Sequence, residues 1–194
     1  LDENEFMVFG SGAAQEMHRR WFESHLDKFN LSYSNRSDEY HGLSIAGPNS
    51  RKVLEKIVRD DVSNEKFKFR DSRRMFVGGV PAIINRISFT GELGYEIYVA
   101  PHYQLKLYEE LMEAGKEFNI KPFGGRALMS MRLEKNWGAW TLDYRPDFTA
   151  KETGLDVFIN WDKEFIGKES AQKENSSNKL IPLIVETNDI DVTN

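Results

Sequence analysis

The sequence predicts an α+β fold, with mixed antiparallel sheets and helices packed against them. A firm strand pattern at residues 80–89 is followed, after a turn with two glycines, by a second strand at 95–99. This arrangement is typical of a β-hairpin. Helical patterns occur between the strands without the steady strand–helix alternation that a doubly wound parallel sheet requires. The mixture of hairpins and helices therefore favours the α+β class.

Helices are predicted where apolar residues recur at spacings of three and four. In the first helix, Ala13, Met17 and Trp21 form such a stripe. Pro48 stands at the start of the second, where its fixed φ suits the first helical turn. The helices expected in chain order cover residues 13–29, 47–58, 102–118, 125–135 and 167–173.

Strands are predicted where apolar side chains alternate with polar ones, or form short runs, between turn residues. The pattern is weaker at 66–70, where basic and aromatic residues alternate, and at 74–77. The strands expected in chain order cover residues 6–9, 40–46, 66–70, 74–77, 80–89, 95–99, 155–160 and 180–186. A strand just inside each end suggests a piece of a longer protein.

The composition excludes several classes of protein. The 194 residues are 40% hydrophobic and 29% charged, as in an ordinary globular protein. A net charge of −5 argues against nucleic acid as the main partner, because phosphate binding needs a basic surface. No apolar run approaches the ~20 residues that span a bilayer, and the acidic start lacks the basic region of a secretory leader. We therefore expect a cytoplasmic protein, or a protein of the mitochondrial matrix if it is eukaryotic.

Metal and thiol chemistry have no support in the sequence. There is no cysteine, and the four histidines are scattered without a ligand partner at metal spacing. A disulfide framework, a thiolate nucleophile and a zinc–thiolate site are therefore excluded. No metal site is expected.

A glycine-rich segment imitates a dinucleotide fingerprint. Residues 6–9, followed by Gly10-Ser11-Gly12, resemble a strand that leads through a glycine turn into a helix. However, Gln15 stands in place of the third glycine, and no well-placed acidic residue follows about 20 residues on. A glycine turn that lets a helix start close to a sheet is the favoured interpretation. A nucleotide-binding domain stays as an alternative, which calorimetry with NAD would test.

Two carboxylates lie in and beside the strand at 95–99. Glu92 belongs to the glycine turn, whereas strand alternation puts Glu96 and Tyr98 on one face and Tyr95 on the other. Periodicity alone favours a solvated hairpin face. Arg126 stands in the first turn of a predicted helix, where a cation opposes the helix dipole, which suggests that it has a partner.

Three segments carry a resemblance to a known family. GELGYEIYV, FGGRALMSMRLEK and GLDVFINWDKEFIGKES occur in this order, at residues 91–99, 123–135 and 154–170. They resemble the folate-binding aminomethyltransferase family, which contains the glycine cleavage T-protein and the folate domain of dimethylglycine and sarcosine dehydrogenases. ELGYEIYV and RALMSMRLEKNWGAW are more similar to the dehydrogenase branch. The resemblance runs from Leu1 to about Glu186.

The resemblance implies a tetrahydrofolate site. The glutamate of the GYE segment, Glu96, would accept two hydrogen bonds from the ring N–H and the exocyclic amino group of the pterin. Arg126 would contact either the anionic glutamate tail or a ring carbonyl. Glu92 is expected to be a turn residue, and Arg132 and Glu134 ordinary surface or ion-pair residues. The candidates for the aromatic walls, each of which could equally be plain core, are Tyr95, Tyr98, Trp137 and Trp140.

The chemistry that the resemblance implies is transfer of a one-carbon unit to folate N5 from a small amine or methyl donor. The proton would be handled by an aspartate expected upstream of Leu1, since Asp2 does not match its motif. A flavin is expected only in a missing domain, such as an amine dehydrogenase domain in the same polypeptide. The fragment alone is expected to be inactive. The alternative is a non-catalytic folate-binding module, like the iron–sulfur assembly relatives of the family.

The same resemblance predicts the domain organisation. Residues 1–34 would form the end of a first subdomain, and residues 35–178 the second, folate-binding subdomain. Within the latter, residues 155–173 would pack back on the first. Residues 179–194 would begin a C-terminal barrel domain.

Overall fold

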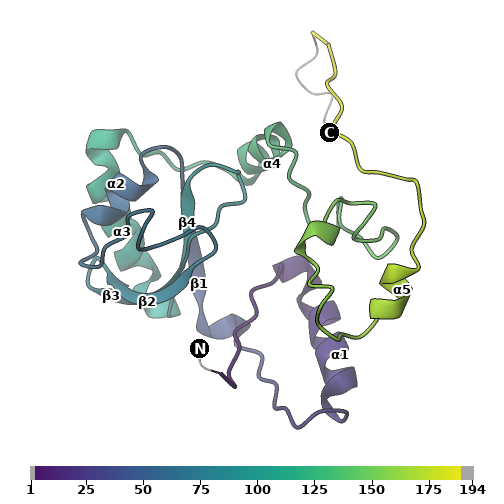
Figure 1. The fold of residues 1–194 in the computed structure, drawn as a ribbon. Coiled ribbons are helices and arrows are strands. Elements are labelled where there is room, and N and C mark those ends of the chain that lie inside the picture. Colours follow the sequence, from purple (N-terminus) through teal and green to yellow (C-terminus); the bar gives the residue numbers. More distant parts are fainter. Residues whose placement is uncertain (1–2, 189–194) are drawn as a thin grey trace. The chain divides into compact units, whose positions relative to one another are not determined.

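The computed structural model describes residues 3–188, and the chain divides into two compact units (Figure 1). The larger unit comprises residues 21–137, and the smaller one residues 1–20 together with 138–194. The larger unit contains a four-stranded antiparallel sheet with the strand order β1-β4-β3-β2. Its strands are β1 (His41–Ala46), β2 (Ser72–Val77), β3 (Val80–Asn85) and β4 (Gly94–Val99). The predicted α+β class is confirmed.

Glycines set the turns and close approaches of this sheet. The β2–β3 hairpin turns at Gly78 and Gly79, whose φ angles of 58° and 78° lie in the left-handed region that glycine adopts without strain. At Gly94, a Cβ atom would lie 2.8 Å from the Ile45 carbonyl oxygen and 2.6 Å from the Ser88 Cβ atom. Only glycine therefore fits at the start of β4.

Two helices cover one face of the sheet, α2 (Ser50–Glu55) and α3 (Gln104–Gly115) (Figure 1). Alternate strand residues and the inner faces of both helices form a single hydrophobic core. Its most deeply buried members, all exposed by 2% or less, include Val53, Leu54, Phe67, Val77, Val80, Ile84, Tyr95, Ile97, Val99 and Leu107. The opposite face of the sheet, to which the other alternate residues point, is called the open face below.

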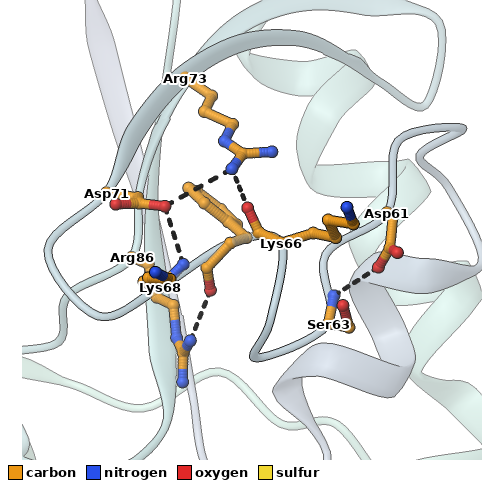
Figure 2. A network of polar contacts seen from close by, with 8 residues as sticks. Asp61, Ser63, Lys66, Lys68, Asp71, Arg73 and Arg86 are labelled. Atoms are coloured by element: carbon orange, nitrogen blue, oxygen red, sulfur yellow. Dashed lines mark hydrogen bonds and ion pairs between the residues drawn. The ribbon is translucent and has the colours of Figure 1, made fainter.

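The strand predicted at residues 66–70 is wrong, because this segment is a folded loop (Figure 2). Phe67 is fully buried, and the Phe67 carbonyl accepts a hydrogen bond from Arg86. Arg73 donates to the Lys66 carbonyl, and its guanidinium lies 5.0 Å from the centre of the Phe67 ring. The Asp71 carboxylate accepts the Lys68 backbone N–H at 2.8 Å. Side chains thus satisfy backbone groups that a neighbouring strand would otherwise pair.

The helix predictions agree with the structure in type and differ at the ends. The helix expected at 13–29 is α1 (Gln15–Leu26), preceded by a short 3₁₀ turn. The expected helices at 102–118 and 125–135 correspond to α3 with a 3₁₀ turn at each end and to α4 (Gly125–Glu134). The last predicted helix is α5 (Lys168–Gln172). Among the described residues, no helix is long and apolar enough to cross a membrane.

Three predicted strands in the smaller unit are wrong. Residues 6–9 and 180–186 form no regular structure, and residues 156–158 form a 3₁₀ turn. Many apolar side chains here are exposed, as Phe6 is by 80% and Ile184 by 95%. A strand needs a neighbour for its backbone groups, and no strand of the described chain pairs with these segments. Residues 1, 2 and 189–194, which include Asp2 and the end of the expected barrel segment, lie outside the described residues.

We predict that Phe67 anchors the loop between α2 and β2. Phe67→Ala leaves a cavity in the core and should lower the free energy of unfolding by about 3–5 kcal/mol. Phe69→Ala is the matched control, because this ring is 67% exposed and its loss should change stability by less than about 0.5 kcal/mol. Denaturant unfolding of both variants measures the difference, and equal losses would contradict the anchoring role.

Candidate functional site

The central strand β4 separates two kinds of side chain. Tyr95, Ile97 and Val99 are exposed by 1% or less and belong to the core, whereas Glu96 and Tyr98 are half-buried on the open face. This alternation confirms the prediction that Glu96 and Tyr98 share one face. Because β4 pairs with β1 on one side and β3 on the other, the two side chains lie in the middle of the sheet rather than at its edge.

A hydrogen bond joins the two polar residues of this face. The Tyr98 hydroxyl donates to Glu96 Oε2 at 2.6 Å. Burial, followed by the bond to Glu96 and its negative charge, raises the pKa of Tyr98 well above that of a free tyrosine. The phenol therefore keeps its proton at neutral pH and holds the Glu96 carboxylate in one orientation.

A glycine in the neighbouring strand makes room for the tyrosine ring. Gly42 of β1 stands directly opposite Tyr98, and a Cβ atom at Gly42 would lie only 3.1 Å from Cε1 of the ring. The ring therefore lies across the backbone of β1. A larger side chain at position 42 would displace Tyr98 and, with it, the orientation of Glu96.

The neighbours of Glu96 across the sheet are also polar. Ser44 of β1 and Asn85 of β3 are the residues in register with it, so both are on the open face. Asn85 Oδ1 is buried and, within the described part of the chain, has no hydrogen-bond partner. Asn85 was not predicted as a site residue from the sequence. The sequence could have indicated Asn85, because it is a polar residue within the predicted strand 80–89, which was expected to pair with the strand that carries Glu96.

A pocket of about 480 Å³ lies beside Tyr98 on the larger unit. Pockets of roughly 300–1,000 Å³ hold small-molecule ligands and cofactors. Tyr98 and Ile83 are in register, two residues along the strands from the Glu96–Asn85 pair and on the same face. Glu96 and Asn85 do not line the pocket, and Tyr98, whose hydroxyl binds Glu96, is the lining residue that links it to the carboxylate. Side chains that line it include Tyr40, Asp60, Arg74, Phe76, Ile83 and Tyr98.

Arg126 stands in the first turn of α4, as predicted, with an exposed side chain. Within the described residues, no hydrogen bond or ion pair joins it to Glu96. The other end of α4 is tied to the turn before β4, since Lys135 Nζ lies 2.8 Å from Glu92 Oε1. Glu92 is thus an exposed turn residue that carries an ion pair.

Tyr95 and Arg132 are both buried. Tyr95, expected as a possible wall of the slot or as core, is a core residue: it is fully buried, stacks on Phe67 at 5.9 Å and accepts a hydrogen bond from Arg51 Nε at 3.1 Å. It therefore points away from Glu96. Arg132, expected at the surface, is only 5% exposed. Its guanidinium donates to the Trp137 carbonyl at 2.8 Å, so it closes the end of α4.

The two tryptophans lie in different units. Trp137 belongs to the larger unit and is 40% exposed. Trp140 belongs to the smaller unit, where its ring meets Tyr144 edge-on at 5.9 Å and His18 at 6.3 Å. A place for either ring in a binding slot stays a prediction. No cluster of three or more potential metal ligands occurs among residues 3–188.

Comparison with known proteins identifies the class. The family model of the GCVT N-terminal domain matches residues 1–163, so the chain belongs to this family. It is 36% identical to human mitochondrial dimethylglycine dehydrogenase over 96% of its length. It is 30% identical to an aminomethyltransferase of Thermoanaerobacter pseudethanolicus over 89%, and 30% identical to the sarcosine oxidase alpha subunit of a Corynebacterium species over 91%.

The chain spans only part of each of these relatives: 22% of the dehydrogenase, 47% of the aminomethyltransferase and 19% of the oxidase subunit. The relatives are enzymes, and their names support the resemblance to the aminomethyltransferase family and to its dehydrogenase branch.

We predict that Tyr98 makes the free energy of unfolding fall at alkaline pH. Above about pH 10 a tyrosine of the unfolded chain ionises, whereas folded Tyr98 keeps its proton because its pKa is raised. The unfolded state then binds fewer protons, so the free energy of unfolding falls as the pH rises. Tyr98→Phe should remove this component, and its melting temperature should fall less than that of the parent between about pH 9 and pH 11. Parallel losses in the two proteins would contradict the prediction.

Proposed function

We propose that this chain is the tetrahydrofolate-binding domain of a one-carbon transferase of the aminomethyltransferase class. The observation that carries the proposal is the Glu96 carboxylate, half-buried on the open face and oriented by Tyr98. The membership in the GCVT family supports it. The Trp137 ring, which belongs to the same unit as Glu96, is proposed as a further wall of the binding slot in the full-length protein.

The chemistry of Glu96 suits the pterin ring. A carboxylate offers two oxygens with about four lone-pair positions, and Tyr98 uses one of them on Oε2. The remaining positions can accept the ring N–H and the neighbouring amino group as a pair of charge-assisted hydrogen bonds. Partial burial excludes competing water and strengthens both bonds.

The pocket beside Tyr98 suits the rest of the molecule. Its volume and its apolar walls, such as Ile83 and Phe76, match the flat aromatic part of a folate. Arg126 is proposed to bind the anionic tail or a ring carbonyl, because its exposed guanidinium opposes the helix dipole at its position. A ligand anion at this point would offset the unfavourable placement.

The proposed reaction is transfer of a one-carbon unit from a small amine, of the kind that the names of the dehydrogenase and oxidase relatives indicate. Tetrahydrofolate supplies N5 as the acceptor of that unit. Residues of this chain would hold the pterin in a fixed orientation, which converts a bimolecular step into an effectively unimolecular one. The proton-handling aspartate, and a flavin-containing domain that oxidises the amine, are proposed for other parts of the full-length protein.

Substitution of Glu96 tests the proposal. In the full-length protein, Glu96→Gln keeps the shape of the side chain but replaces an acceptor by a donor that faces another donor. We expect a loss of about 2–4 kcal/mol in binding, or roughly 30- to 1,000-fold in tetrahydrofolate affinity, measured by calorimetry.

Glu92→Gln is the matched control, because Glu92 is exposed and its ion pair with Lys135 lies at the surface. Its affinity should change by less than about threefold. The assignment of β4 to pterin recognition fails if Glu96→Gln binds as tightly as the parent.

Of the two arginines of α4, Arg126 should affect folate affinity and Arg132 should affect the free energy of unfolding. Arg126→Ala is expected to weaken folate binding while sparing or raising the melting temperature, because it removes a cation from the start of a helix. Arg132→Ala should lower the free energy of unfolding by about 1–3 kcal/mol, since it leaves the Trp137 carbonyl without its donor. Calorimetric affinity and thermal unfolding of both variants check this, and unchanged affinity in Arg126→Ala would contradict its role.

A further inference from the structure

Asn85 presents a buried acceptor that the fold itself does not use. Its Oδ1 atom is shielded from solvent and has no hydrogen-bond partner among residues 3–188. Leaving such an oxygen unpaired destabilises a protein, because the group loses its hydrogen bonds to water and gains none. Buried polar atoms in native proteins nearly always have a partner. Because this oxygen lies beside a candidate binding site, a ligand could supply the missing hydrogen-bond donor.

The position of Asn85 shows which donor it could reach. Asn85 and Glu96 are directly opposite each other in the β3–β4 ladder. The Cβ atoms of such a pair are about 4.5–5.5 Å apart, so the two side chains can contact the same ligand group. Their neighbours along the strands, Ile84 and Ile97, are buried in the core, which confirms that Asn85 and Glu96 share the open face.

Together, the two side chains present hydrogen-bond acceptors side by side. Glu96 contributes carboxylate oxygens, and Asn85 contributes an amide oxygen. A ligand that pairs both carboxylate oxygens of Glu96 and the amide oxygen of Asn85 must offer at least three hydrogens. A ring N–H beside an exocyclic amino group carries three: one on the ring and two on the amino nitrogen. A ligand without the amino group would leave Asn85 Oδ1 unpaired.

We propose that Asn85 is a specificity-determining residue, whose Oδ1 accepts one amino hydrogen of the ligand while Glu96 accepts the other amino hydrogen and the ring N–H. The inference rests on the proposed function and deepens it. It restricts the ligand to pterins that keep the 2-amino group. Discrimination of this kind arises because a site built to hydrogen-bond a group leaves its own polar atom unpaired when that group is lost.

A two-by-two binding experiment tests this in the full-length protein. The ligands are 5-formyltetrahydrofolate, a stable reduced folate, and its 2-desamino counterpart. The variants are Asn85→Ala and Asn85→Val, of which the second keeps the strand preference of a β-branched residue if the first does not fold. We expect both variants to bind the amino ligand about tenfold more weakly than the parent does.

The 2-desamino ligand separates recognition from a structural role. It should bind the parent and the Asn85 variants within about threefold of one another, because the bond in question cannot form with it. An equal loss for both ligands would show that Asn85 only shapes the site, and would overturn the proposal. Ser72→Ala is the control, since Ser72 is the exposed residue opposite Asn85 in β2, and it should change neither affinity.

The same measurements distinguish failure of the Asn85 proposal from failure of the proposed function. If Asn85 variants bind the amino ligand like the parent while Glu96→Gln binds it weakly, the role of Asn85 is refuted and the folate site stands. If the parent binds neither ligand, the proposed function fails, and the inference about Asn85 fails with it.

Discussion

The structure of the larger unit depends on its central strand, which is paired on both edges and buried on one face. β4 pairs with a strand on each side, and alternate residues of it enter the core formed with α2 and α3. Because the side-chain period of a strand is two, fixing Tyr95 and Ile97 in that core fixes Glu96 and Tyr98 on the opposite face. A slip of one residue would bury a carboxylate in apolar surroundings, at a large cost in free energy. The core thus determines the position of the candidate site.

The polar residues of the open face are positioned by their neighbours in the sheet. Gly42 lets the Tyr98 ring lie across β1, and the Tyr98 hydroxyl orients Glu96. Asn85 on the next strand keeps an unpaired oxygen at the same level of the sheet. This combination of one satisfied and one unsatisfied acceptor is expected for a binding surface, because a purely structural network would pair every buried group.

Arginines support the sheet from outside the site. Arg51 donates to the Tyr95 hydroxyl, and both Arg51 and Arg86 donate to Asn64 Oδ1 at 2.6 Å. Arg86 also holds the Phe67 carbonyl, so the loop before β2 and the end of β3 are joined through a single guanidinium. These contacts stabilise the ends of the central strands without using the side chains of the open face.

The sequence alone determined the class of fold, most elements between residues 40 and 135, the shared face of Glu96 and Tyr98, and the family. Local periodicity and turn residues carry this information, and the family resemblance rests on short contiguous segments. Only the tertiary structure decided that Phe67 is a buried anchor rather than part of a strand, that Arg132 is buried, and that Asn85 lies beside Glu96. It also left residues 6–9 and 180–186 without strand pairing. The physical reason is that pairing and burial depend on neighbours distant in the chain, which local patterns do not specify.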